Sequence, residues 1–292
     1  YVTVTNDSGN VLFMHTADEA SEGVDVFAAE VEAALIYITS PTGVIARAEH
    51  DAIADPLESD YACFLSIENR RSRGEAMAQL VDRCIALYPD STYAAFWHAR
   101  RSYAHYQAAI AAGEPISRDG PGWTELSKAL DIDPTNAFAN FVAAKVELTV
   151  GRCEFARNYI NRALQRGASY PALVAAAEAE SSACQASEEE TEDAARRLGT
   201  FARFNPSPDS LLHVYLVLGL VSVDDMETAR AFSQQLVIEA PDGAVDTTSD
   251  LLRRALGENP QDRPGNDELR SAIRLFVWNP AATEEIVARI QQ

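Results

Sequence analysis

The start of the chain alternates apolar or aromatic side chains with threonine, a period of two that is typical of a β-strand. Tyr1–Asn6 shows this pattern, and Val11–His15 follows as a second strand after the turn-forming residues Asp7–Asn10. The pattern therefore predicts a β-hairpin over residues 1–15. Because an isolated hairpin is marginally stable in water, we expect a helix, strands from upstream of Tyr1 or another chain to cover it.

After the hairpin the apolar residues recur every three or four positions, which predicts helices. Val24–Ile38 is the first helix, and Pro41 and Gly43 end it. Val44–Ile53 is a second, shorter helix, which ends before Asp55-Pro56. We expect the first helix to cover the hairpin. Its apolar positions are Val24, Phe27, Val31, Ala34, Leu35 and Ile38.

The rest of the chain has a helical pattern, and proline closes successive helices at a regular interval. Pro206 and Pro241 are 35 residues apart, and Pro134 lies 72 residues before Pro206, which is two similar intervals. Pro89 to Pro134 is 45 residues, an excess that the Gly- and Pro-rich stretch 113–122 explains. A period of roughly 34 residues with two helices in each repeat is the signature of tetratricopeptide repeats.

Small or apolar residues recur at matching places within each interval, where the two helices of a repeat must approach closely. They stand twelve and five residues before the closing position. The pattern predicts a mainly α fold, with a tetratricopeptide-like α-solenoid over residues 57–292 and a partial α/β domain over residues 1–56 before it. An irregular helical bundle is the alternative. The matching positions are Ala229 and Leu236, Ala194 and Phe201, Ala156 and Ala163, Gly122 and Ala129, and Met77 and Cys84.

Short stretches in the first third of the chain form an ordered set. Each is weak alone, and their order along the chain carries the resemblance described next. The stretches are Thr3-Val-Thr, Gly9-Asn-Val-Leu, Phe27, Glu30, Ser40-Pro-Thr-Gly-Val-Ile-Ala-Arg47, Tyr61-Ala-Cys-Phe-Leu65 and Arg83-Cys-Ile-Ala-Leu-Tyr-Pro-Asp90.

The first of these stretches look like the second half of the small α/β domain related to the TolB amino-terminal domain. The whole set resembles the carboxy-terminal part of bacterial membrane-anchored winged-helix regulators of the CadC/ToxR type. Similar modules also follow class III nucleotide cyclase domains. The resemblance implies a periplasmic repeat region. The winged helix, the transmembrane helix and the first half of the α/β domain are not in this sequence, so the DNA-binding role of such regulators does not carry over to it.

The four cysteines form two pairs by their places in the predicted helical hairpins. When a turn joins two antiparallel helices, two residues that face each other have sequence numbers whose mean falls in that turn. Cys63 and Cys84 centre on 73.5, at the turn of the first hairpin, and Cys153 and Cys184 centre on 168.5, in the loop Gly167–Tyr170. A disulfide needs Cα atoms within about 7 Å, which side-by-side helices permit at such places. We predict both disulfides and therefore an oxidising compartment; four buried free thiols in a cytosolic chain are the alternative.

Charge and hydropathy argue against several kinds of partner. The 292 residues hold 24 Lys and Arg against 44 Asp and Glu, and the net charge of −20 disfavours nucleic acid and anionic membrane surfaces. The longest apolar run, about Leu211–Val223, is interrupted by polar residues and is too short to span a bilayer. The chain begins at Tyr1 without a signal peptide, so we expect a partial or processed chain with any export signal or anchor upstream.

No arrangement of residues in the sequence indicates catalysis or a bound cofactor. There is no Gly-rich phosphate loop, no nucleophile elbow and no recognisable pair of catalytic carboxylates. His98 and His105 share one helical face, but no Cys or carboxylate stands at zinc-ligand spacing with them. We therefore expect no enzymatic activity, no cofactor and no metal site.

The acidic run Glu188–Asp193 precedes a helix that we predict over Ala194–Phe204. Negative side chains stabilise the positive amino end of a helix dipole, and we expect this role for the run. Attraction of a basic partner is the alternative.

The concave face of the predicted solenoid is the candidate binding surface, because the first helix of each repeat lines it. Aromatic residues and arginine are enriched in protein-binding surfaces, and Arg100 and Lys145 could attract an anionic group of a partner in this acidic chain. Packing between helices is the alternative for each residue. The predicted groove residues are Tyr93, Phe96, Arg100, Tyr103, Phe138, Phe141 and Lys145, with Leu211, Val214 and Leu218 from a later repeat.

The leading functional hypothesis is non-enzymatic. We expect an extracytoplasmic sensing or protein-interaction module of a membrane-anchored bacterial signalling or transcription-regulating protein, placed in the periplasm. Its partner would be a protein or peptide, with a homodimer left open and no nucleic acid bound by this region. Contact with the membrane would come only through an anchor outside this sequence. The alternatives are a soluble periplasmic adaptor of a larger complex and the regulatory tail of a class III nucleotide cyclase.

Overall fold

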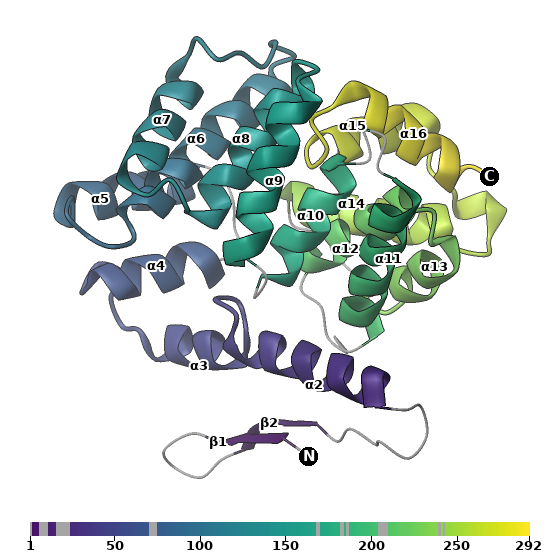
Figure 1. Ribbon diagram of the computed structural model, residues 1–292, viewed down its shortest axis with the longest axis horizontal. Coiled ribbons are helices and arrows are strands. Elements are labelled where there is room, and N and C mark those ends of the chain that lie inside the picture. The colour runs from purple at the N-terminus through teal and green to yellow at the C-terminus, as the bar shows by residue number, and fades with distance from the viewer. Residues whose placement is uncertain are drawn as a thin grey trace.

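The computed structural model is mainly helical (Figure 1). It has a short hairpin at the amino end, two helices beside the hairpin, and then a series of packed helices. No described helix is both long and apolar enough to cross a membrane. The residues that the structure describes are 2–5, 11–15, 24–69, 75–167, 170–181, 184, 187–203, 210–238, 241 and 243–292.

The predicted hairpin is confirmed. Strand β1 (Val2–Thr5) pairs antiparallel with β2 (Val11–His15), and the register pairs Val2 with His15 and Val4 with Phe13. Within the described residues the sheet contains only these two strands, so an α/β domain is not established. Strand β2 contacts helix α3. The cover expected from Val24–Ile38 and the domain boundary after residue 56 stay predictions.

Helices α2 (Val24–Thr39) and α3 (Val44–Ala52) occupy the two segments predicted from the apolar period. They lie between the hairpin and the remaining helices in Figure 1. A glycine is needed at position 43, because a Cβ there would stand 2.3 Å from the carbonyl oxygen of Tyr37. Ala34 and Ile38 of α2 are buried as the pattern predicts, whereas Leu35 is 47% exposed.

The following helices pack in consecutive pairs. The first helices of neighbouring pairs also contact one another from α6 to α14, so they form an inner row. The pairs are α4 (Asp60–Asn69) with α5 (Glu75–Leu87), α6 (Ala94–Ala111) with α7 (Pro121–Ile132), α8 (Ala137–Thr149) with α9 (Cys153–Gly167), α10 (Pro171–Ser181) with α11 (Glu188–Arg203), α12 (Ser210–Ser222) with α13 (Met226–Ser233), and α14 (Gly243–Leu256) with α15 (Asn266–Arg274). A short 3₁₀ helix, Pro260–Asp262, precedes α15, and α16 (Pro280–Ile290) ends the chain.

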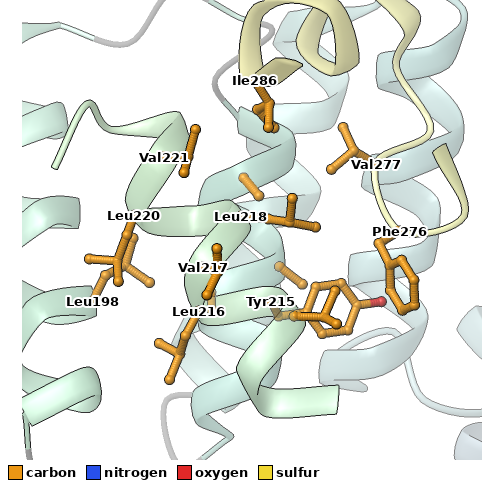
Figure 2. Packing of buried hydrophobic residues seen from close by; sticks show 14 of the residues in the cluster. Leu198, Tyr215, Leu216, Val217, Leu218, Leu220, Val221, Phe276, Val277 and Ile286 are labelled. Carbon is orange, nitrogen blue, oxygen red and sulfur yellow. The ribbon is translucent and has the colours of Figure 1, made fainter. Parts of the chain in front are cut away.

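Helix α12 lies at the centre of the largest hydrophobic cluster. Every residue from His213 to Ser222 is buried, which explains why this apolar run has no polar face. Its side chains meet Leu198 of α11, Val277, and Ile286 of α16 (Figure 2). Gly219 lets α12 approach α10, since a Cβ there would stand 3.0 Å from the carbonyl oxygen of Ala175.

The small residues that the repeat pattern singles out lie where helices meet. Ala156, Ala194 and Ala229 are at most 2% exposed. A Cβ on Gly122 would stand 2.9 Å from the ring of Tyr106, so this glycine permits the close approach of α6 and α7. These positions behave as the pattern predicts.

Both predicted disulfides are present. Cys63 of α4 is joined to Cys84 of α5, with Cα atoms 6.0 Å apart, and Cys153 of α9 is joined to Cys184, with Cα atoms 5.4 Å apart. All four cysteines lie within the described residues, and none is free. Two disulfides indicate an oxidising, extracytoplasmic compartment.

Helix α11 begins six residues earlier than predicted, so the acidic run belongs to its first turns. Ser187 stands at the amino end, and its Oγ accepts a hydrogen bond from the backbone N–H of Glu190 at 3.2 Å. The Glu190 carboxylate accepts one in return from the backbone N–H of Ser187 at 2.8 Å. This reciprocal capping box fixes the start of the helix, and the hydrogen bonds lower the pKa of Glu190.

Candidate functional site: a cavity on the inner row of helices

A cavity of about 370 Å³ opens on the inner row of helices. Helices α4, α6, α8, α10 and α12 all contribute to its wall, and α9, the segment after α2 and the turn before α8 complete it. Its rim carries the exposed residues Thr92, Thr135 and Arg166. The side chains that matter for its chemistry are Phe64, Glu68, Tyr93, Phe96, Arg100, Tyr103, Phe138, Phe141, Arg166, Tyr170 and Tyr215.

Aromatic rings form a continuous wall from α4 across α6 to α8. The rings of Phe64 and Tyr93 are stacked with centroids 4.5 Å apart. Phe138 meets Phe96 edge to face at 5.9 Å and Tyr103 at 5.7 Å. Aromatic pairs in these geometries contribute beyond the area that they bury, so the wall is held in a defined shape.

Arg100 is the partly buried cation of the cavity wall, and Arg166 is an exposed cation on its rim. The guanidinium carbon of Arg100 lies 4.1 Å from the ring centroid of Phe138 and 5.0 Å from that of Phe96. Its Nη2 donates to Glu68 Oε2 at 2.9 Å, and the side chains are 20% and 4% exposed. The ion pair is therefore largely removed from water and gains from the rings around it.

This ion pair leaves two buried atoms without a hydrogen-bond partner. Glu68 Oε1 and Arg100 Nε are both inaccessible to water and make no hydrogen bond to any described residue. An unpaired buried donor or acceptor costs roughly 1–3 kcal/mol of stability. The wall thus holds one unused acceptor on α4 and one unused donor on α6, and these side chains must turn toward the cavity before a ligand can reach the two atoms.

Tyr170 completes the polar part of the cavity with a neutral hydroxyl. Burial raises its pKa far above the ordinary value, and the nearby charge of Glu68 adds to this effect while Arg100 opposes it. The hydroxyl can therefore donate or accept a hydrogen bond and brings no charge.

Most of the predicted groove residues line the cavity, and their part in partner binding stays a prediction. Six of the seven predicted groove residues line it, namely Tyr93, Phe96, Arg100, Tyr103, Phe138 and Phe141. Several of them also belong to the core, since Phe96, Tyr103 and Phe141 are at most 6% exposed. Leu211 lines the cavity as well, whereas Val214 and Leu218 are fully buried beside it.

The prediction for Lys145 is wrong. This side chain is fully buried and forms an ion pair with Glu180 of α10. The carboxy-terminal segment Leu275–Asn279, between α15 and α16, covers it. Because Arg100 and Lys145 each have a carboxylate partner, the pair of free cations expected for an anionic group does not form.

The segment Leu275–Asn279 lies on the same inner row and is held by its backbone. Lys145 Nζ donates to the carbonyl oxygen of Phe276, and Glu180 Oε1 accepts from the backbone N–H of Trp278 at 3.1 Å. Gln107 of α6 donates to the carbonyl oxygen of Leu275 at 3.3 Å. Helices α6, α8 and α10 of the inner row therefore already bind a stretch of this chain.

Two tyrosines separate this bound segment from the open cavity. Tyr103 of α6 and Tyr215 of α12 line the cavity, and their hydroxyls are 3.0 Å apart. Tyr103 also stacks on Trp278 with centroids 5.3 Å apart, and Tyr215 meets Phe276 edge to face at 5.6 Å (Figure 2). The cavity and the segment thus share a wall one side chain thick.

Sequence reasoning missed Glu68, Arg166, Tyr170 and Tyr215. Tyr215 lies one residue after Val214, so a one-position shift in the repeat register would have found it. Glu68 follows Tyr61–Leu65 on the first helix of the first pair, where the same register applied to α4 would have placed it. Tyr170 and Arg166 lie at the junction of α9 and α10, and we find no sequence signal for them.

Two further clusters of titratable groups lie within the described part of the chain. His98 Nδ1 lies 2.7 Å from Glu125 Oε2; burial raises the pKa of Glu125, but hydrogen bonds from Lys128 and His98 outweigh this and lower it. His213 contacts Ser249, but the histidine is fully buried in the core. Among the described residues no group of three or more His, Cys, Asp or Glu is placed to hold a metal ion.

Comparisons with known proteins add no relative. No family model matches the chain, and neither a curated protein nor a solved structure is significantly similar to it. The interpretation of the cavity therefore depends on its own residues and geometry.

Proposed function

We propose that this chain is an extracytoplasmic protein-interaction or sensing module. In this proposal its paired helices form a tetratricopeptide-like α-solenoid, and the inner row of helices binds a segment of a partner protein. The module would belong to a membrane-anchored bacterial signalling or transcription-regulating protein and act in the periplasm. It would have no catalytic activity of its own.

The cavity is the observation that carries the proposal. Five first helices of consecutive pairs contribute to one hollow, and its wall is aromatic around a single buried ion pair. A volume of about 370 Å³ is near the small end of the range for binding pockets, which suits one or two large side chains of a partner. Rigid aromatic walls lose little conformational entropy on binding, so such a hollow is a good anchor site.

The two disulfides support an oxidising, extracytoplasmic compartment for this protein. Each joins residues that are far apart in the sequence, and both would be reduced in a cytosol kept at a low redox potential. The resemblance of the ordered motifs to membrane-anchored regulators supports the periplasm and the signalling role.

Site-specific photo-crosslinking tests this proposal. A benzophenone amino acid at Thr135, on the cavity rim, should form an adduct with one partner in cells that produce the protein. The same amino acid at Thr124, an exposed threonine of α7 that does not line the cavity, is the matched control. The Thr135 adduct should be lost in F138A and kept in F155A, because Phe138 lines the cavity and Phe155 is 57% exposed on α9.

An equal adduct from Thr124, or an adduct from Thr135 that survives F138A, would contradict binding at the cavity. The absence of any adduct from both Thr135 and Thr92, the second rim position, would contradict it as well.

A further inference from the structure

We infer that the cavity takes a short peptide stretch by its backbone, with Arg100 donating to a backbone carbonyl and Glu68 accepting from a backbone N–H. An aromatic or large apolar side chain of that stretch would enter the ring-lined hollow. The inference rests on the proposed function and names the chemistry of the partner segment.

The chain's own carboxy-terminal segment is the template for this mode of binding. Lys145 donates to the carbonyl oxygen of Phe276, and Glu180 accepts from the N–H of Trp278. Phe276 lies in the turn that follows α15, and the chain leaves this turn at Val277. A neighbouring cation and carboxylate on the inner row thus bind two backbone groups that flank a single residue, Val277.

The cavity repeats this arrangement on the other side of the tyrosine pair. There the cation is Arg100 on α6 and the carboxylate is Glu68 on α4, whereas in the template the cation is on α8 and the carboxylate on α10. Both cations also face aromatic rings: Lys145 lies 4.7 Å from the ring centroid of Trp278, and Arg100 lies 4.1 Å from that of Phe138. The same inner surface therefore carries two cation–carboxylate pairs in aromatic surroundings.

The two pairs differ in what they bind besides each other, although Glu180 Oε2, like Glu68 Oε1, is buried without a hydrogen-bond partner among the described residues. The segment Leu275–Asn279 supplies partners to Lys145 and Glu180. In the cavity, Glu68 Oε1 and Arg100 Nε are buried and unpartnered within the described part of the chain. Glu68 is 96% removed from water, as the 4% exposure of its side chain shows, so this acceptor has no ready substitute in solvent.

The charged side chains that line the cavity balance, with Glu68 and Asp133 against Arg100 and Arg166, and this balance favours a peptide backbone over an anionic group. Glu68 already neutralises Arg100, so an anion would meet the Glu68 carboxylate as well as the guanidinium. A backbone amide brings one donor and one acceptor without net charge, and both would form charge-assisted hydrogen bonds with this pair. The aromatic wall provides the apolar surface for a side chain of the bound stretch, as Tyr103 does for Trp278, the residue whose N–H Glu180 binds.

Selection from a random dodecapeptide display library against the intact, disulfide-bonded chain tests the inference. We expect enriched peptides with a central aromatic or large apolar residue. Synthetic copies with both ends blocked should bind as well as copies with free ends. The variant E68Q should weaken their affinity at least ten-fold, because its amide nitrogen cannot accept a hydrogen bond; E154Q, an exposed Glu-to-Gln change on α9, should leave it unchanged.

An N-methyl scan of the enriched peptide examines the contact without changing the protein. One N-methyl group should weaken binding to the unmodified chain at least ten-fold and have little further effect on E68Q, because both changes remove the same hydrogen bond. Additive losses would overturn the contact with Glu68. In R100K the charge is kept but the Nε donor is lost, so binding should also weaken, whereas R157K on α9 is the matched control.

Two results would overturn the inference and leave the proposed function standing. One is enrichment of peptides whose binding disappears when the terminal carboxylate is amidated, which would identify an anionic end as the ligand. The other is the absence of any enriched peptide together with a cavity-dependent adduct from Thr135, which would show a partner recognised in another way.

Discussion

His213 should make the stability of this protein depend on pH below about pH 6.5, where an unfolded histidine begins to take up a proton. The Nε2 atom of His213 lies 3.2 Å from the carbonyl oxygen of Ser233 and its Nδ1 lies 2.5 Å from Ser249 Oγ. Since the carbonyl can only accept, the neutral ring carries its proton on Nε2 and accepts from the serine at Nδ1. Burial lowers the pKa of His213 to about 4; the hydrogen bond to Ser233 opposes this shift, and the charge of Arg253 adds to it.

The size of the effect follows from this lowered pKa. An unfolded histidine has a pKa near ~6.5, so between about pH 6.5 and pH 4 the unfolded state binds the proton more readily than the folded state. The stabilisation is complete above about pH 6.5 and is lost as the pH falls toward 4. A shift of about 2.5 units corresponds to roughly 3 kcal/mol, of which most should be lost by about pH 4.5.

Chemical unfolding followed by tryptophan fluorescence, repeated at half-unit steps of pH, measures this dependence. We compare the unmodified chain with H213Q, whose amide can still donate to the Ser233 carbonyl but does not titrate. H213Q should be less stable at pH 7.5, and the difference between the two proteins should shrink by about 2–3 kcal/mol by pH 4.5. H105Q, on helix α6, is the control for a histidine-to-glutamine change. Parallel stability curves for the unmodified chain and H213Q would refute the reasoning.

Three further changes test the structural elements. Removing the first disulfide in C63S/C84S should lower the free energy of unfolding by about 3 kcal/mol, because the cross-link restricts a loop of the unfolded chain; intact mass should also rise by four hydrogens when the unmodified protein is reduced. K145M should lower that free energy by about 3–5 kcal/mol by leaving Glu180 buried and unpaired, and K145M/E180M should cost less than K145M in the same denaturant titration. Amide hydrogen exchange of the intact protein should be slow across β1 and β2, and free exchange there would contradict a covered hairpin.

Much of the fold could be predicted because the signals are local or strictly periodic. The alternation over residues 1–15 and the three-to-four spacing over Val24–Ile38 each depend only on which face of an element is buried. The disulfides could be paired because two helices joined by a turn bring residues with a common midpoint together. Cys63 with Cys84 is such a pair, and the structure joins them.

The start of α11 was misplaced although its signal is in the sequence. Ser187 followed three residues later by Glu190 is a capping box, and it sets the first turn at Glu188. The charge of the run alone places these residues before the helix, whereas the cap places them within its first turns. Local hydrogen bonding, and not the net charge of the run, decides where this helix begins.

The cavity was predicted where repeat periodicity controls it and missed where distant chain segments meet. Phe138 and Arg100 lie on the inner row because each is on the same face of the first helix of its pair. The periodicity places Lys145 on that face too, but a segment 131 residues later in the chain covers it. No repeat pattern encodes this closure, because Leu275–Asn279 lies between helices and carries no repeat signature of its own.

The placement of that carboxy-terminal segment bears on how the molecule folds. In a linear array, each repeat touches only its neighbours, so the ends can unfold while the middle persists. Here Gln107 is bonded to Leu275 across 168 positions, and Asn279 donates to the carbonyl oxygen of Leu148 at 2.7 Å. These contacts tie α6 and α8 to residues that are synthesised much later than they are. The array from α6 to α16 should therefore melt as one cooperative unit, and its inner surface should reach its final shape only once residues 275–279 have been synthesised.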